Sequence, residues 1–437
     1  MSDTQSERIL ILGGGFGGLY TAMELEKQLS RRPDVAITLV NRDNFFSFTP
    51  MLHEVAASDL DMTHIVNPVR KMLKRTQLFL GDVERIDLDG RRVVVRHGSD
   101  AHSHELEYDH LVLGLGAVTN FYGLPGLEER ALTMKSLGDA IYLRNRLIDN
   151  LEEADTECAA KACLRGPLMT CVVAGGGFAG VETIAAVNDF VRGALRFYRN
   201  LQSDHVRMVL VHSGQVILPE LNEKLGRYAE KKLTQRGIEI RLDVRVTGVT
   251  DEGVQLSDGT TIPTKTIVWT AGTAPNPLLG ELACGKERGR IVANEFLEVP
   301  ERPGVWSLGD CAVIADPATG KPYPPTAQHA LRQARVLAHN LAVAVRGSGR
   351  RKPFVFSTLG QLATIGRRTG VANIMGINFS GFIAWWLWRS IYLSKLPRAE
   401  KKLRVVLDWT LDLLFSKDLV QFSTFRSPSI TSQGGNR

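Results

Sequence analysis

Residues 174–182 read Ala174-Gly175-Gly176-Gly177-Phe178-Ala179-Gly180-Val181-Glu182, and residues 12–18 read Leu12-Gly13-Gly14-Gly15-Phe16-Gly17-Gly18. Both stretches have the spacing Gly-x-Gly-x-x-Gly, and each follows an apolar, strand-like run and opens a segment with helical periodicity. In that setting the glycines allow a tight turn and a close approach to phosphate, whose charge meets backbone amides at the helix N-terminus. One such loop could serve packing alone, but two in matching settings predict two bound dinucleotides.

Each glycine loop starts a predicted β-α-β unit, in which the second strand usually ends in an acid that binds the adenosine ribose. In this chain the first unit reaches Asn41 at that point, and the second reaches His212. Asn41 can still hydrogen-bond a hydroxyl, although without a negative charge. Two later strand-like runs end in glycine, at Gly116 and Gly272, and we expect both to lie beside the nucleotides.

A further short strand ends in Gly309-Asp310, and a helix is expected from Ala327, with Thr326 before it as a cap. An acid at a strand end beside a bare helix N-terminus suits a flavin, because Asp310 could accept hydrogen bonds from ribityl hydroxyls. The helix dipole would then stabilise negative charge on the reduced ring system. The alternative is that Asp310 is a turn residue and Thr326 an ordinary cap.

The totals place the chain among ordinary globular proteins. Its 437 residues suggest two or three domains, and its apolar and charged fractions, 44% and 23%, do not favour disorder. Five cysteines without a Cys-x-x-Cys motif argue for a reducing compartment and against a disulfide framework or a structural zinc site. The polar residues 1–8 lead directly into a strand, so no secretory signal is expected.

The order of these motifs resembles the two-dinucleotide-domain flavoproteins, in which an FAD domain is interrupted by a nicotinamide domain. Within that group, residues 327–333 (Ala-Gln-His-Ala-Leu-Arg-Gln) resemble the Ala-Gln-x-Ala-x-x-Gln segment of type II NADH:quinone oxidoreductases. Residues 45–54, 362–367 and the aromatic run 381–388 are also similar to that family. The resemblance extends over about residues 7–420.

The resemblance implies an α/β fold with two Rossmann-like dinucleotide-binding domains, the second inserted in the first. We expect FAD-binding residues at 1–120 and 276–375, an NAD(P)H-binding domain at 121–275, membrane-associating helices at 376–426, and a disordered tail at 427–437. The expected cofactors are FAD and NADH, and NADPH is not excluded.

In that family a hydride passes from NADH to flavin N5, and two electrons then pass to a membrane quinone without proton pumping. The positions carried over for FAD are Gly13, Gly15, Phe16, Gly18, Asn41, Gly116, Gly309, Asp310 and Ala327. The positions carried over for the nicotinamide dinucleotide are Gly175, Gly177, Phe178, Gly180, Glu182, His212 and Gly272. The expected catalytic positions are Glu182, near the nicotinamide end, and Gln328, where quinone meets the flavin; no metal is expected. No side chain need act as a nucleophile, because the cofactor carries the chemistry.

Two positions depart from the family, which commonly has an acid where this chain has Asn41 and a glutamate where it has His212. The second acid selects NADH by binding the ribose 2′-hydroxyl, and it would repel the 2′-phosphate of NADPH. His212 does not repel that phosphate, so the choice between the two nucleotides stays open. NADH is favoured here only because the family uses it.

The C-terminal segment joins an uncharged aromatic run to a basic cluster. Residues 376–388 carry no charge and hold three tryptophans, but a spanning helix needs ~20 apolar residues, so this run is interfacial, re-entrant or buried. Residues 389–404 hold six basic residues and one acid, which accounts for +5 of the net charge of +6. One helical face then collects Leu403, Val406, Leu407, Leu411 and Leu414.

Periodicity alone favours packing of that helix on the protein's own core. The aromatic run, the basic cluster and a membrane-dissolved electron acceptor together favour the bilayer instead. We therefore expect residues 376–420 to attach peripherally to an anionic bilayer surface, at the cytoplasmic face of the cell membrane. Beyond the quinone and lipid, a homodimer is possible, and nucleic acid is not an expected partner of this nearly neutral body.

Two local interpretations rest on pattern alone. Residues 45–54 are rich in phenylalanine and read as a hydrophobic connector, with His53 and Glu54 as surface polar residues. Residues 239–249 read as one strand.

Three other functions share parts of this pattern. A sulfide:quinone oxidoreductase shares the architecture but needs redox cysteines; Cys158 and Cys163 could pair, yet no cysteine follows Cys311. A disulfide reductase would carry Cys-x-x-x-x-Cys just after the first β-α-β unit, where this chain has none. A membrane-associated redox sensor that binds FAD and NAD(P)H with low turnover would need the same loops.

Overall fold

The computed structural model describes residues 7–98, 100–156 and 162–421, and its chain divides into two compact units. Unit 1 consists of Met1–Ser47, Val66–Val118 and Thr273–Thr358. Unit 2 consists of Phe48–Ile65, Thr119–Gly272 and Leu359–Arg437. Cys158 and the tail at 427–437, on which two of the predictions fall, lie outside the described residues.

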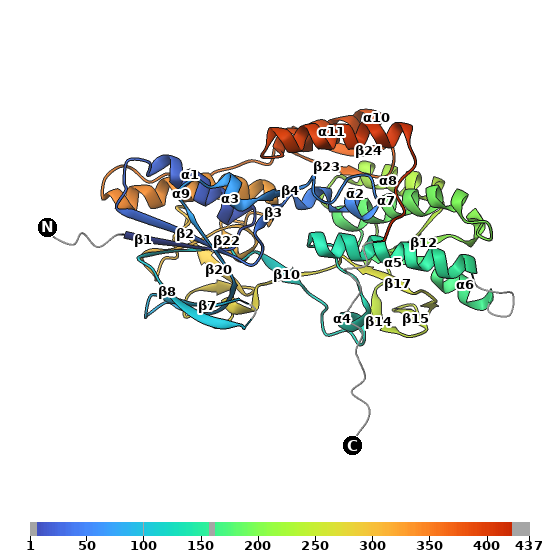
Figure 1. Cartoon of the computed structure of the whole chain (residues 1–437), viewed down its shortest axis with the longest axis horizontal. Helices are drawn as coiled ribbons and strands as arrows, with labels where there is room; N and C mark the ends of the chain where they lie inside the picture. Colours follow the sequence, from blue (N-terminus) through green and yellow to red (C-terminus); the bar gives the residue numbers. More distant parts are fainter. Residues whose placement is uncertain (1–6, 99, 157–161, 422–437) are drawn as a thin grey trace, which may run out of the picture. The chain divides into compact units, whose positions relative to one another are not determined.

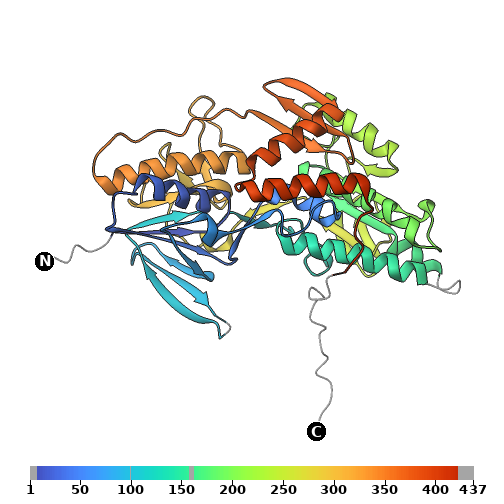
Figure 2. The same cartoon turned by 45° about the horizontal axis from the view of Figure 1, so that its top comes forward.

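Unit 1 is built on a parallel five-stranded sheet in the order β21-β9-β1-β2-β5. Its strands are β1 (Glu7–Leu12), β2 (Val35–Asn41), β5 (Gln77–Leu80), β9 (His110–Leu113) and β21 (Val305–Ser307). Two helices, α1 (Phe16–Gln28) and α9 (Ala327–Arg346), lie side by side on this unit (Figures 1 and 2). Because both faces of a parallel sheet are covered, its strands are nearly continuous apolar runs, as in the buried residues 9–12.

Smaller elements complete unit 1. Two antiparallel or mixed three-stranded sheets are formed by β6 (Asp82–Asp87), β7 (Arg92–His97) and β8 (His102–Glu107), and by β19 (Lys286–Glu287), β20 (Arg290–Ala293) and β22 (Ala312–Ile314). Short pairs are formed by β3 (Phe45–Ser47) with β4 (Val66–Pro68), and by β10 (Ala117–Thr119) with β18 (Thr273–Pro275). The short helices are α3 (Val69–Met72), η5 (Pro277–Leu279) and η6 (Gly309–Cys311).

Unit 2 repeats the plan of unit 1 on a parallel four-stranded sheet in the order β13-β12-β11-β17. Its strands are β11 (Thr170–Ala174), β12 (Arg207–Val211), β13 (Ile238–Arg241) and β17 (Thr266–Trp269). Its longer helices are α5 (Leu137–Thr156), α7 (Phe178–Ala194) and α8 (Glu223–Gln235). The remaining elements of this part are α4 (Leu127–Arg130), α6 (Ala162–Leu168), η3 (Leu195–Phe197), η4 (Ser203–His205), and the antiparallel strands β14 (Val246–Thr250), β15 (Gly253–Leu256) and β16 (Thr261–Ile262).

The prediction of one strand over residues 239–249 is wrong. β13 belongs to the parallel sheet, whereas β14 pairs with β15 in a separate antiparallel sheet. The chain turns between them at Asp243, whose φ of 56° lies in the left-handed region. Apolar residues on both sides of the turn hide it from a reading of periodicity, because Asp243 is tolerated there without glycine.

The C-terminal part of unit 2 is a helix pair on a small antiparallel sheet. The sheet consists of β23 (Gly360–Thr364), β24 (Gly370–Ile374) and β25 (Ile377–Gly381), and the helices are α10 (Phe382–Lys395) and α11 (Ala399–Leu414). Figure 2 shows the two helices side by side. Also in unit 2 are η1 (Thr49–Met51) and α2 (Leu52–Ala56). Among the described residues, no helix combines the length and apolar composition needed to span a bilayer.

Helix α11 packs on the rest of unit 2 through the buried residues Lys401, Val405 and Trp409, and it leaves its leucine-rich face exposed. Asp408 pairs with His64 at 2.5 Å, and Lys401 donates from Nζ to the Thr63 carbonyl at 2.5 Å. The leucine and valine face predicted from the sequence is exposed, at Leu403, Val406, Leu407, Leu411 and Leu414. A helix whose only apolar contact is its own core would bury such a leucine stripe.

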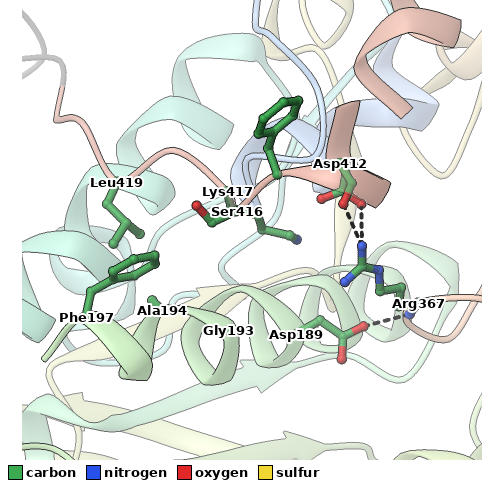
Figure 3. A pocket seen from close by; sticks show the side chains of 10 residues that line it. Asp189, Gly193, Ala194, Phe197, Arg367, Asp412, Ser416, Lys417 and Leu419 are labelled. Atoms are coloured by element: carbon green, nitrogen blue, oxygen red, sulfur yellow. Dashed lines mark hydrogen bonds and ion pairs between the residues drawn. The ribbon is translucent and has the colours of Figure 1, made fainter. Parts of the chain in front are cut away.

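The end of α11 is fixed over α7, where a small pocket lies under the following segment (Figure 3). Arg367 donates from Nη2 to the Asp412 carboxylate at 3.3 Å, and its backbone N–H donates to Asp189 Oδ2 at 2.6 Å. Lys417, which follows the helix, pairs with Asp59 at 2.6 Å. These charge-assisted bonds hold the orientation in which the apolar face points away from unit 2.

Candidate functional site

The first glycine loop has the geometry of a phosphate-binding turn. Gly13 has a φ of 97°, and its N–H donates to the Val40 carbonyl at 2.9 Å. The Gly14 N–H donates to Asn41 Oδ1 at 2.8 Å. A Cβ at Gly18 would lie 1.9 Å from the Gly13 carbonyl oxygen, so helix and strand meet too closely for any side chain. Gly13 thus has a conformational reason to be glycine and Gly18 a steric one.

The start of α1 leaves room and donors for a diphosphate. Gly15 is the N-cap residue, no side chain caps this end, and the first turn holds no acid. A Cβ at Gly15 or at Gly116 would meet nothing within 4 Å, so the space beside the loop is open. The free backbone amides and the positive end of the helix dipole fit the pyrophosphate of FAD.

Gln333, whose role the sequence did not indicate, connects helix α9 to the segment that carries Asp310. Gln333 accepts at Oε1 a hydrogen bond from the Gly309 N–H at 2.8 Å, and so ties η6 to α9. The cap predicted at Thr326 is present, since its hydroxyl accepts from the His329 N–H at 3.4 Å. Asp310 lies in η6, next to Gly309, and Gln328 lies in the first turn of α9.

The second glycine loop repeats the first bond for bond. The Gly175 N–H donates to the Val211 carbonyl at 2.9 Å, as Gly13 does to Val40. The Gly176 N–H donates to His212 Nδ1 at 3.2 Å, as Gly14 does to Asn41. In both loops a neutral side chain at the end of the second strand therefore holds the second glycine.

The start of α7 also fits a diphosphate. Gly177 is its N-cap, with no capping side chain and no acid in the first turn, and Phe178 is the first helical residue. A Cβ at Gly180 would lie 1.8 Å from the Gly175 carbonyl oxygen. Gly272 lies after β17, where a Cβ would meet the Tyr122 ring at 2.6 Å.

Further along α7, Glu182 is buried, with 9% of its surface exposed. Its Oε1 accepts two hydrogen bonds, from the Thr364 N–H at 3.1 Å and from the Trp388 indole N–H at 3.0 Å. Its Oε2 lies 3.8 Å from Nδ1 of His53. Burial raises the pKa of Glu182 to about 8, against the opposing effect of both hydrogen bonds.

His53 and Glu54 of α2 lie in the interior of unit 2, so the prediction that they are surface polar residues is wrong. Burial lowers the pKa of His53 to about 3, so the ring is neutral, and its Nε2 lies 3.2 Å from the Thr364 hydroxyl. Because Glu182 is protonated at neutral pH, the contact between His53 and Glu182 is not an ion pair. The apolar neighbours Leu52, Val55 and Ala56 are also buried, which the helical spacing of this segment could have indicated.

Glu54 belongs to a second buried group. Its Oε2 accepts from the Trp409 indole N–H at 3.2 Å, and its Oε1 lies 3.8 Å from Nη2 of Arg389. The Arg389 guanidinium lies between Trp385 and Trp409, at 4.2 and 4.5 Å from the ring centroids. Burial raises the pKa of Glu54 to about 7, although the charge of Arg389 acts in the opposite direction.

Two members of the predicted basic cluster are therefore directed into the protein. Arg389 faces Glu54 and Lys401 faces Thr63, so neither is available to a lipid surface. Lys395 and Arg404 are exposed. The sequence overstated the cluster because periodicity cannot show which cations have a buried partner.

The described cysteines near the two sheets are structural. Cys311 is buried and donates to the carbonyls of Leu113 and Leu308 at 3.2 and 3.1 Å. Burial raises the pKa of the Cys171 thiol to about 12 and raises that of Cys311. Cys171, Cys284 and Cys311 are all free thiols. A buried thiol with a raised pKa is a poor nucleophile, which weighs against a redox role for Cys311.

Comparisons with known proteins agree with this architecture. The sequence model described as pyridine nucleotide-disulphide oxidoreductase matches residues 7–334, and the one described as NDH2 C-terminal domain matches residues 359–418. Type II NADH:quinone oxidoreductase Ndh of Mycobacterium tuberculosis is 32% identical, over 94% of this chain and 89% of that protein. Demethylphylloquinone reductase NdbB of Synechocystis is 32% identical, over 92% of this chain and 95% of that protein. The solved structure of NDH2 from Plasmodium falciparum with NADH shares the fold at a TM-score of 0.88, with 17% identity over 95% of this chain and 100% of that one.

Replacing Gly180 by alanine should destabilise unit 2, because the new methyl group would overlap the Gly175 carbonyl. We expect a loss of at least about 2 kcal/mol in urea unfolding. The matched control is Gly193→Ala on the same helix, where a Cβ meets nothing within 4 Å. That change should instead stabilise by about 0.5–1 kcal/mol through helix propensity. Equal effects of the two substitutions would contradict the close packing inferred for the loop.

Replacing Glu182 by glutamine should reduce the dependence of stability on pH. Because its pKa rises from 4.5 to about 8 on folding, the neutral carboxyl stabilises the fold fully below about pH 4.5 and loses this contribution as pH rises through about 8. Between about pH 5 and 9, the free energy of unfolding of the wild type should fall by up to about 4 kcal/mol more than that of Glu182→Gln. Glu223→Gln in α8, at an exposed carboxylate, is the control and should parallel the wild type.

Proposed function

Because this chain belongs to the type II NADH:quinone oxidoreductase family, it is an FAD-dependent enzyme that oxidises NADH and reduces a quinone without proton pumping, and we propose how its residues divide this work. The observation that carries the assignment of roles is the repeated loop geometry. Each loop holds its second glycine with a neutral side chain and presents a helix N-terminus without a cap. Bound FAD supplies the two-electron chemistry between NADH and quinone.

Unit 1 binds FAD in this proposal. Gly13, Gly15 and Gly18 shape the loop whose amides bind the pyrophosphate, with Phe16 as the first residue of the helix. Asn41 would hold the ribose, and Asp310 would hold the ribityl chain. Gly116, Gly309 and Ala327 would lie beside FAD, at positions where a bulky side chain would overlap the cofactor.

Unit 2 binds NADH. Gly175, Gly177 and Gly180 form the pyrophosphate loop, Phe178 begins the helix, and His212 stands at the adenosine ribose. Gly272 lies where the chain leaves the sheet. Glu182, one turn into α7, lies toward the nicotinamide end.

Glu182 and Gln328 are the residues proposed to act at the reacting end. Reduction of a quinone to a quinol consumes two protons with two electrons, so a neutral carboxyl is useful beside it. Glu182 carries such a proton at neutral pH, because burial raises its pKa to about 8. The proton resides on Oε2, since Oε1 already accepts from Thr364 and Trp388. Gln328 orients the quinone through its amide.

The exposed apolar face is proposed to attach the protein to the membrane surface. On α11 it comprises Leu403, Val406, Leu407, Leu411 and Leu414, and α10 adds Phe382, Ile383 and Trp386. Exposed patches of this kind mark interaction sites, and the exposed cations Lys395 and Arg404 would add attraction to anionic lipid. We place the attachment at the cytoplasmic face, within residues 376–420. The possible homodimer stays a prediction.

The rival functions differ in what they require. A sulfide-oxidising enzyme needs reactive thiols, whereas Cys311 is buried with a raised pKa and Cys171 likewise. A sensor with low turnover would bind the same nucleotides, and only the rate of reaction separates it from an enzyme.

Turnover of the FAD-loaded protein with NADH and a water-soluble quinone analogue tests the function and the role of Glu182 together. We expect kcat to fall as pH rises through about 8, because Glu182 then loses its proton. Glu182→Gln should lower kcat by at least about tenfold and remove this dependence. Glu223→Gln should leave both unchanged.

Turnover with sulfide in place of NADH, or none with NADH while FAD is bound, would contradict the proposed reaction. A Glu182→Gln variant with the rate and pH profile of the wild type would contradict the role of Glu182 alone.

Substituting Leu407 and Leu411 by glutamate should release the protein from vesicles of anionic and zwitterionic phospholipid. Both side chains are about half exposed, at 52% and 50%, so their replacement should change the free energy of unfolding little. Each buried leucine contributes roughly 1.5–3 kcal/mol, so the double change should weaken sedimentation with vesicles by at least about 100-fold. The matched control substitutes Val355 and Leu359, which are also exposed apolar residues, by glutamate. Equal loss in both double variants would contradict attachment through α11.

A further inference from the structure

We propose that this enzyme oxidises NADPH as well as NADH, because His212 has taken over the structural role of the ribose-binding acid without its charge. This inference rests on the proposed function, in which the loop at the start of α7 binds the nicotinamide dinucleotide. It goes beyond that function by assigning a second substrate, one with a 2′-phosphate on the adenosine ribose.

The residue at the end of the second strand has two separable tasks. One is to accept a hydrogen bond from the second glycine, and the other is to face the ribose of the bound nucleotide. Both units perform the first task with a neutral acceptor, Asn41 Oδ1 for Gly14 and His212 Nδ1 for Gly176. A neutral side chain at this position is thus sufficient to preserve the loop geometry.

His212 is neutral in this position. Its Nδ1 accepts the Gly176 N–H, so the ring proton lies on Nε2. Burial also lowers the pKa of His212, which keeps the ring uncharged at neutral pH. Nε2 faces the loop after β12, because a Cβ at Gly214 would lie 2.9 Å from it. The ring is also hydrogen-bonded to the backbone of Val216. No negative charge therefore stands at the position where an acid would repel the phosphate.

The loop after β12 adds donors and no acid. Ser213, Gly214 and Gln215 follow His212 and offer a hydroxyl, a backbone N–H and an amide. Neutral donors of this kind can donate hydrogen bonds to a 2′-phosphate, although they attract it less than arginine does. We therefore expect both nucleotides to be used, not a reversal in favour of NADPH.

Three other acids lie near this site. Asp243 and Glu230 both act on the titration of His212. Glu230 is paired with Arg227 at 3.1 Å, and Asp243 is exposed, with its backbone N–H bonded to the Gly214 carbonyl at 3.2 Å. Glu220 lies near Gly177, where a Cβ would be 2.9 Å from its Oε1. Glu220 therefore faces the pyrophosphate loop, which both nucleotides share, and cannot distinguish between them.

The reaction balances with the substrates already assigned. NADPH, one proton and a quinone give NADP⁺ and a quinol, and two electrons pass through the bound FAD. The quinone is the oxidant of the established activity, so no further reactant is needed.

A binding measurement tests the inference independently of turnover. The probes are ADP-ribose and ADP-ribose 2′-phosphate, titrated calorimetrically into the full-length FAD-loaded protein. We expect dissociation constants within about tenfold of each other in the wild type. His212→Asp should weaken binding of the phosphorylated probe, relative to binding of ADP-ribose, by at least about a further tenfold. The matched control is His212→Asn, which has nearly the same shape as aspartate, copies Asn41 and should keep the wild-type ratio.

Turnover provides the second readout. With a soluble quinone analogue, kcat/KM for NADPH should be within about tenfold of that for NADH in the wild type and in His212→Asn. In His212→Asp the ratio of the NADPH value to the NADH value should fall by at least about tenfold. A wild type that uses NADH but discriminates against NADPH and the phosphorylated probe by more than about 100-fold would overturn the inference. So would identical ratios in the aspartate and asparagine variants. Failure with NADH itself would refute the proposed function instead, and the two probes would still report on His212.

Discussion

A carboxyl group can remain inside a protein if it is neutral or paired, and unit 2 uses both solutions. Glu182 is deeply buried, and no lysine or arginine of the described part of the chain pairs with it, so burial keeps it protonated at neutral pH. Glu54 lies beside Arg389, which is itself enclosed by Trp385 and Trp409. The two indole donors Trp388 and Trp409 bond one carboxyl each, so the aromatic residues of α10 and α11 serve as polar partners as well as apolar filling.

The same helices explain why the C-terminal segment behaves unlike an ordinary amphipathic helix. Their polar and indole groups are used inside unit 2, on Glu54, Glu182, Thr63 and His64. The leucine face of α11 is left exposed to the outside. The ion pair between Arg367 and Asp412 helps to hold the helix in this orientation. A single segment can thus complete a buried site and present an apolar surface.

The sequence predicted the features that are local in the chain. Gly-x-Gly-x-x-Gly specifies a turn between a strand and a helix, and both loops adopt it with the bonds that Gly13 and Gly175 require. The partners of Glu182 could not be predicted in this way, because Thr364 and Trp388 lie about 200 residues along the chain and only tertiary packing brings them to it. His53 and Glu54 were misread for the same reason. A polar dipeptide in an apolar run gives no indication of its burial until Trp409 and Arg389 are in place.

The central claim is that Glu182 holds a proton at neutral pH. Infrared difference spectroscopy between the wild type and Glu182→Gln measures this directly, because a protonated carboxyl and a carboxylate absorb in separate regions. The account predicts a protonated-carboxyl band in the wild type near pH 7 that is missing from the variant and disappears as pH rises through about 8. A carboxylate band for Glu182 near pH 7 would contradict it.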